Sequence, residues 1–204
     1  MTGNQRGPYA KTALQKDKIL RAALDYFGQH GFNAASMREL AREVGLSQPG
    51  LLHHFGTKTD LLIALIDERD AITMEGINKT VEKTGSAIDG IVRVVEHNSE
   101  NANLTRMFAI VSAEATHPDH PAYDYFRRRS IRLIPLIGGQ LELAAATGEI
   151  DPVVNVEVSA RLVTAMMAGL QVQWLQNPGI DMVGLFRCFI RATFPPRTDR
   201  QAPS

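Results

Sequence analysis

The side chains best suited to a defined chemistry lie between residues 36 and 58. Gln48 carries an amide that can bond adenine N6 and N7 together, and Arg38 carries a guanidinium that can reach guanine or phosphate. Lys58 places an ammonium at the start of an expected helix, whose N-terminal N–H groups also attract anions. An isolated surface glutamine or arginine is usually only solvated. These side chains therefore indicate nucleic-acid recognition only if the surrounding elements present them on one surface.

The segment that would present them, residues 36–55, predicts two short helices joined by a tight turn. Ser36 is a good N-cap, and Glu39 three residues later completes a capping box. Gly45 follows the last apolar position of the first helix, where a left-handed backbone is needed to stop it. Ser47 can then cap the second helix. This is the pattern of a helix-turn-helix, whose second helix enters the DNA major groove.

Helical spacing of apolar residues continues on both sides of this motif. The pattern predicts an all-α fold of about nine helices, with no strand-like alternation and no internal repeat. Thr57, followed by Asp60 three residues later, predicts the start of the fourth helix. We expect residues 1–12 to lack regular structure. Outside the motif, the expected helices are roughly 12–30, 58–83, 87–100, 105–116, 122–146, 157–176 and 181–193.

Composition places the 204 residues among ordinary globular chains. There is no run of ~18 apolar residues that could cross a membrane. The N-terminus has no apolar leader segment, so we expect no secretion signal. The single cysteine, Cys188, cannot form an intrachain disulfide, which favours a reducing, cytoplasmic location. Its apolar neighbours predict an inert thiol.

The net charge of zero conceals an uneven distribution along the chain. Residues 1–58 contain eight Lys or Arg and four acidic residues, whereas residues 59–204 contain 14 and 18. The basic part is the part with the helix-turn-helix, as expected if that end faces phosphates. A random division of charge could produce the same imbalance, so the distribution is only a modest signal.

Three stretches resemble the TetR family of bacterial transcription regulators, namely ILRAALDYFGQHGF, SMRELAREVGLS and GLLHHFGTKTDLL. The resemblance implies a DNA-binding domain over residues 13–73 and a ligand-binding and dimerisation domain over residues 74–195. It also implies a homodimer that binds a palindromic operator in double-stranded DNA, usually as a repressor that a small molecule releases. The alternative is an activator or architectural DNA-binding protein without a small-molecule effector.

Position within the family motif implies ten DNA contacts. They are Ser36, Met37, Arg38, Gln48, Pro49, Gly50, Leu52, His53, His54 and Lys58. Family members usually have an aromatic residue, often tyrosine, where this chain has Leu52, so one phosphate contact is missing or replaced. Pro49 and Gly50 also leave few polar side chains for reading bases. Of the two histidines, we favour His53 as the contact and His54 as partly structural.

The helix expected at 157–176 is apolar on more than one face, so it must be buried on more than one side. A monomeric core would satisfy this pattern. We favour a dimer in which the last two helices and their mates form a four-helix bundle. The dimerisation residues would be Leu162, Gly169, Val172, Met182, Leu185, Phe186 and Phe189.

A ligand pocket is expected among the helices of residues 87–176. Methionine-rich walls suit an adaptable and largely apolar pocket, although each candidate could equally belong to an ordinary core. Glu114, His97 or Gln171 could supply a polar anchor. The candidate wall residues are Met107, Phe108, Val111, Tyr123, Phe126, Met166, Met167 and Trp174.

The sequence offers no catalytic motif. We find no phosphate-binding loop, dinucleotide fingerprint, zinc-protease motif or nucleophile elbow, so we expect neither an enzyme nor a cofactor. His117 and His120 lie close together in the chain, but closed metal sites usually need three or four ligands, so we expect no metal. The arginine run 127–129 is interpreted as a solvated helix face.

Overall fold

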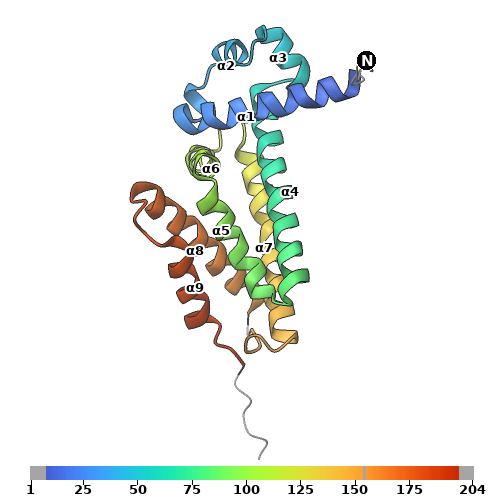
Figure 1. The fold of residues 1–204 in the computed structure, drawn as a ribbon. Coiled ribbons are helices and arrows are strands. Elements are labelled where there is room, and N and C mark those ends of the chain that lie inside the picture. The colour runs from blue at the N-terminus through green and yellow to red at the C-terminus, as the bar shows by residue number, and fades with distance from the viewer. Residues whose placement is uncertain (1–7, 154, 198–204) are drawn as a thin grey trace, which may run out of the picture. The chain divides into compact units, whose positions relative to one another are not determined.

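The computed structural model describes residues 8–153 and 155–197, and this part of the chain contains nine helices and no strand (Figure 1). The all-α prediction is therefore confirmed. The first helix begins at Pro8, so the expectation of irregular chain up to residue 12 is wrong from there on, and residues 1–7 lie outside the described part. The helices are α1 (Pro8–Ala34), α2 (Met37–Glu43), α3 (Gln48–Phe55), α4 (Lys58–Thr84), α5 (Ala87–Glu100), α6 (Ala102–Glu114), α7 (Tyr123–Ala146), α8 (Val156–Gln176) and α9 (Met182–Thr193).

The helices form two compact units. The first unit contains the chain up to Arg69 together with residues 106–123, and the second contains residues 70–105 and the chain from Asp124 onward. This division differs from the contiguous one expected at residues 73 and 74. Most of α6 and the loop after it belong with the N-terminal helices, and the hydrogen bond between Glu114 and the backbone of Phe32 is one of the contacts between them.

The first unit is held together by apolar side chains from four helices. They lie at the helical spacings seen in the sequence, and each is completely buried, which removes its apolar surface from water. Ile19, Ala23, Phe27, Leu40, Leu51, Leu61, Leu62 and Ile66 belong to this set.

The end of α2 is fixed by its backbone and by one lysine. Gly45 has a φ of +76°, as predicted for the residue that stops this helix. Its N–H donates to the carbonyl of Arg42 at 3.1 Å, and the next N–H, of Leu46, donates to Ala41 at 2.8 Å. The ammonium of Lys18 donates to a remaining carbonyl, that of Val44, at 2.9 Å. These hydrogen bonds hold the turn before α3.

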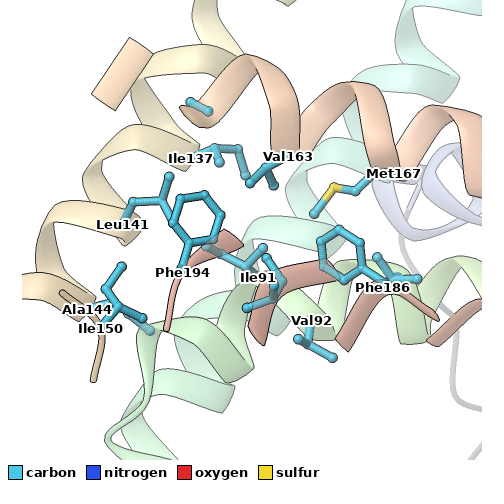
Figure 2. Close-up of a cluster of buried hydrophobic side chains, with 14 of the residues drawn as sticks. Ile91, Val92, Ile137, Leu141, Ala144, Ile150, Val163, Met167, Phe186 and Phe194 are labelled. Carbon is cyan, nitrogen blue, oxygen red and sulfur yellow. The ribbon is translucent and has the colours of Figure 1, made fainter. Parts of the chain in front are cut away.

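The second unit has its own core, built from α5, α7, α8 and α9 (Figure 2). Phe186 and Phe194 lie among aliphatic side chains such as Ile91, Leu141 and Val163. Two residues predicted to form a dimer interface belong here instead, since Met182 is 2% exposed and Phe186 is 0% exposed within the single chain. The prediction for these two was wrong because α9 directs this apolar face toward its own α5 and α8.

Two polar contacts join distant parts of the second unit. The carboxylate of Glu149 accepts hydrogen bonds from the Ser86 hydroxyl at 2.5 Å and the Ala87 N–H at 2.8 Å, so it caps the N-terminus of α5. Arg129 donates to both carboxylate oxygens of Asp70, each at 2.6 Å. The guanidinium of Arg129 is thus paired and mostly buried, which corrects its interpretation as part of a solvated face.

Within the described helices, none has an apolar stretch of the length that a membrane crossing requires.

Candidate nucleic-acid interface

The recognition helix of the predicted motif is α3. Its cap forms as expected, with the Ser47 hydroxyl accepting a hydrogen bond from the N–H of Gly50 at 3.2 Å. Pro49 lies in the first turn, where its missing N–H leaves no bond unmade. Leu51 is completely buried, whereas Gln48 in the first turn of the helix and His53 near its end are both exposed. These two side chains are among the few polar groups of α3 that could read bases.

The two adjacent histidines differ in exposure. His53 is exposed and His54 is half-buried, with their rings 6.0 Å apart. Leu52 is half-buried and offers no hydroxyl for a phosphate. The more accessible imidazole is the one that the sequence favoured as the contact, although contact with DNA itself stays a prediction.

The start of α2 carries the other expected contacts. The Ser36 hydroxyl accepts from the N–H of Glu39 at 3.4 Å, which is one half of the capping box. The other half is replaced, because the Glu39 carboxylate accepts a hydrogen bond from the Tyr26 hydroxyl at 2.5 Å. That bond raises the pKa of Tyr26. Arg38 is exposed next to this cap, whereas Met37 is half-buried.

Lys58 begins α4 beside a reciprocal cap between Thr57 and Asp60, as predicted. Its ammonium lies 4.5 Å from the ring centroid of Phe32 and 3.4 Å from the carbonyl oxygen of Asn33. Burial lowers the pKa of Lys58, and the negative charge of Glu114 opposes this effect. The ammonium predicted to contact phosphate is therefore half-buried and already has partners in the free chain.

The eight candidate pocket residues are divided between the two units. Met107, Phe108, Val111 and Tyr123 belong to the first, and Phe126, Met166, Met167 and Trp174 belong to the second. Met107 and Val111 are completely buried in the first unit, and Met167 lies in the core of the second. The eight residues therefore do not surround one cavity within either unit. The sequence could not show this, because the apolar spacing that marks a pocket wall also marks a core.

A groove that the sequence did not predict lies between α4 and α5 in the second unit. It has a volume of about 180 Å³. It is lined by Ile72, Thr73, Glu75, Gly76, Lys79, Arg93 and His97. His97 was predicted as a possible polar anchor, whereas the other lining residues follow no apolar pattern in the sequence that would indicate a pocket. Arg93 is already engaged there by the carboxylate of Glu100, at 2.8 and 2.9 Å.

The outer faces of α8 and α9 carry apolar side chains that the single chain leaves exposed. Leu162, Val172 and Leu185 are 51%, 44% and 48% exposed. Gly169 lies in the same stripe, and a Cβ there would meet no other atom within 4 Å. Val158, 50% exposed, extends the stripe by one turn and was missed, although its spacing from Leu162 could have shown it.

Other predicted dimerisation residues occupy different positions. Phe189 is partly buried against the core of the second unit. Cys188 is exposed on α9, so the expectation of a thiol inside an apolar environment is wrong. The apolar residues Phe186 and Ile190 lie on the buried side of the helix, whereas Cys188 lies on an exposed side.

The two histidines of the loop after α6 shape that loop. The Nδ1 atom of His117 accepts from the N–H of Asp119 at 3.3 Å, and that of His120 accepts from Ala122 at 3.1 Å. Within the described residues, no three side chains of His, Cys, Asp or Glu are grouped as metal ligands would be. The roles seen for these imidazoles are those of turn and packing residues.

Parts of this chain are similar to known transcription regulators. Residues 19–65 match the sequence model of a family described as bacterial regulatory proteins, tetR family. The transcriptional activator FasR of Mycolicibacterium smegmatis is 28% identical over 109 residues, which cover 50% of each chain. The transcriptional repressor BepR of Brucella suis is 22% identical over 182 residues, which cover 85% of this chain and 87% of BepR. This chain thus spans about half the length of FasR and most of BepR.

Solved structures share the fold at low sequence identity. FadR from Bacillus subtilis, in complex with stearoyl-CoA, has a TM-score of 0.73 and 17% identity, covering 86% of this chain and 95% of FadR. AibR, in complex with isovaleryl coenzyme A and operator DNA, has a TM-score of 0.67 and 18% identity, covering 89% of this chain and 99% of AibR. At such identities the likeness shows the arrangement of helices.

Proposed function

We propose that this chain, which belongs to the TetR family of transcriptional regulators, is a homodimeric repressor that a small molecule releases from a palindromic operator. The family consists of transcription regulators rather than enzymes. The observation that carries the proposal is the geometry of α3. The helix is capped at Ser47 and anchored by the buried Leu51, and it leaves Gln48 and His53 exposed.

The DNA contacts that we propose follow from this geometry. Gln48 is the candidate for reading a base, because its amide can pair with both N6 and N7 of adenine. Arg38, His53 and Lys58 are candidates for phosphate contacts, which fix the register of a protein on DNA without reading its sequence. The remaining contacts, at Ser36, Met37, Pro49, Gly50, Leu52 and His54, follow from position in the motif.

Dimerisation is proposed through the exposed stripe of α8 and the exposed face of α9. The stripe holds Val158, Leu162, Gly169 and Val172, and α9 adds Leu185. Covering them with a second copy would form a four-helix bundle that buries on the order of 2,000 Å² if the dimer is obligate. The two-fold axis would place two recognition helices about 34 Å apart, one turn of DNA.

Acyl thioesters of coenzyme A are the first effector class that we propose to test. The support is that FadR was solved with stearoyl-CoA and AibR with isovaleryl coenzyme A, and both share the fold. The mechanism would be a shift between two conformations, of which only one binds DNA and the other binds the effector more tightly.

The test is selection of bound DNA from a random library by the purified protein at ~0.15 M salt. We expect enrichment of a palindrome whose half-sites are about one helical turn apart. Adding acyl-CoA molecules of increasing chain length to that complex should identify one that releases the DNA. Enrichment of no sequence would overturn the proposal of a specific operator, and enrichment without release by any acyl-CoA would reject only the effector class.

The second candidate is a transcriptional activator, and the similarity to FasR, described as an activator, favours it. A reporter gene placed behind the selected operator distinguishes the two functions. Loss of the protein should raise expression for a repressor and lower it for an activator.

A further inference from the structure

A cluster of polar and aromatic groups surrounds Phe32 in the first unit. Helix α1 breaks just before it, at Gly31, where φ is +72°. The N–H of Phe32 then donates to the Glu114 carboxylate at 2.6 Å, over 82 positions of sequence. The ring of Phe32 meets the His120 ring at a centroid distance of 4.9 Å and carries the Lys58 ammonium at 4.5 Å. One buried aromatic residue thus contacts α4, the end of α6 and the loop that follows.

The position of the Glu114 carboxylate requires the glycine. A Cβ added at Gly31 would lie 2.6 Å from one carboxylate oxygen, which is closer than real Cβ contacts come. The positive φ of Gly31 also disfavours any other residue there. The break in α1 and the carboxylate therefore fit together as one site.

Two sets of partners compete for the Lys58 ammonium: the groups around it in the free chain and a phosphate of bound DNA. In the free chain its ammonium is half-buried against the Phe32 ring and the Asn33 carbonyl, in the electrostatic field of Glu114. A phosphate contact at the start of α4 would require the same ammonium to leave that position. Moving the ammonium to a phosphate costs free energy, and this cost grows with the strength of its interactions in the free chain. The negative charge of Glu114 contributes to those interactions.

We infer that Glu114 is a positioning residue. Its negative charge holds the Lys58 ammonium against the Phe32 ring and the Asn33 carbonyl, and thereby limits DNA affinity. The inference rests on the proposed function, because it assigns Lys58 to a DNA phosphate. Glu114 lies in the segment 106–123, which continues directly into the second unit at both ends. A movement of that segment that takes the Glu114 carboxylate away from Lys58 would release the ammonium for DNA. A movement that keeps the carboxylate close to Lys58 would retain the ammonium.

The decisive variant is Glu114→Gln, which keeps an oxygen to accept from the Phe32 N–H but removes the charge that attracts Lys58. We expect it to bind the selected operator about three- to fivefold more tightly, a gain typical of one partly exposed charge pair. In the background Lys58→Met the same change should give no gain, because the residue on which Glu114 acts is absent. A gain of equal size in both backgrounds would mean that Glu114 only repels DNA, and would overturn the inference.

Asp119→Asn is the matched control, since it removes an exposed charge from the same segment. It should change affinity much less than Glu114→Gln, and an equal gain would count against a special role for Glu114. Circular dichroism and the melting temperature would show whether each variant is folded.

A measurement on the unaltered protein does not depend on any variant folding. The pKa of Lys58 can be followed by NMR of lysines labelled at Cε, without DNA and with the operator. We expect it to lie below that of the other lysines in the free protein and to rise on DNA binding, as the ammonium moves from the ring to a phosphate. An unchanged pKa in the complex would overturn the inference.

The two proposals can fail separately. If the unaltered protein binds no DNA, the proposed function fails and the role of Glu114 falls with it. If the protein binds its operator and Glu114→Gln leaves affinity unchanged, only the inference about Glu114 fails.

Discussion

At the scale of single residues, the proposed base recognition would depend on few side chains. Among the exposed positions of α3, only Gln48 and His53 offer polar side chains of this kind, because Pro49 and Gly50 occupy positions that could otherwise carry polar groups. A recognition helix of this kind concentrates its discrimination in one amide. Affinity then depends mainly on the phosphate contacts around it.

Substitution of Gln48 tests whether one amide carries the discrimination between bases. Gln48→Ala should weaken binding to the selected operator by ~1–3 kcal/mol and leave binding to unrelated DNA nearly unchanged, because a bidentate base contact is lost. Fluorescence anisotropy with both DNAs measures the two affinities. Gln29→Ala, an exposed glutamine on α1, serves as control. Equal losses on both DNAs would show that Gln48 does not read a base.

Lys58 should behave in the opposite way. Lys58→Ala should weaken binding to all DNA alike and lower the slope of log affinity against log salt by about one, because one fewer counterion is released. Titrations at several salt concentrations give the slope. A variant with the slope of the unaltered protein would remove Lys58 from the phosphate contacts.

His120 predicts a dependence of stability on pH. Its Nδ1 accepts a backbone N–H, and burial lowers the pKa of the imidazole below 6.5, with Lys58 lowering it and Glu114 raising it through their charges. Below pH 6.5 the unfolded chain therefore binds more protons than the folded chain, so the stabilisation present above that pH is lost as pH falls. The loss from this group is at most about 1.4 kcal/mol per pH unit.

The variant His120→Phe isolates this contribution. It keeps a ring against Phe32 but cannot titrate, so its free energy of unfolding should fall less between pH 7 and pH 5 than that of the unaltered protein. Urea unfolding at each pH gives the comparison. Parallel pH profiles would exclude His120 as the titrating group.

At the scale of helices, buried polar contacts decide which elements pair. The contact between Asp70 and Arg129 joins α4 to α7 within the second unit, with side chains 23% and 11% exposed. Removing one partner from such a pair leaves a poorly hydrated charge behind, and that is more harmful than losing the attraction itself.

Arg129→Met should therefore destabilise the protein by about 3 kcal/mol, at the lower end for a buried pair because some water reaches it. Arg127→Met, two residues earlier on an exposed face, should change stability by less than about 0.5 kcal/mol. Urea denaturation followed by circular dichroism measures both. Similar midpoints for the two variants would show that the pair contributes nothing.

At the scale of the whole molecule, the proposed function requires two copies. Leu162 and Leu185 lie half exposed on α8 and α9, and this exposure leaves apolar surface that a second copy would remove from water. Residues 1–58 carry a net positive charge, with eight Lys or Arg against four acidic residues, so a dimer would offer two such positively charged segments to DNA.

Replacing both leucines by glutamate, Leu162→Glu with Leu185→Glu, should give a folded monomer, because paired carboxylates cannot be buried at a two-fold interface. Light scattering gives the mass, and operator affinity should fall at least tenfold as the two half-sites are bound separately. Ile131→Glu, at an apolar position on α7 that is 61% exposed, is the control and should remain dimeric. A dimer that survives the double substitution would place the interface elsewhere.

The sequence alone determined the order of the helices and those of their ends that a cap or a stop residue marks, because such signals depend on neighbours within a few positions. The unmarked start of α1 at Pro8 was not determined in this way. The caps at Ser36, Ser47 and Thr57 and the stop at Gly45 form where the residue types predicted them. The same local motif also identified the helix-turn-helix, since its spacing and turn residues are contained in 20 consecutive positions.

Only the tertiary structure decided which side chains meet across long sequence separations. Periodicity shows that a residue is apolar and on one face, but it does not say whether that face meets its own chain or a partner, and so Met182 and Phe186 were misplaced. Nor does it pair polar groups, since Arg129 reaches Asp70 over 59 positions and the Glu114 carboxylate reaches the backbone N–H of Phe32 over 82. Such contacts form only when the packed helices bring distant backbones together, and no local pattern encodes that distance.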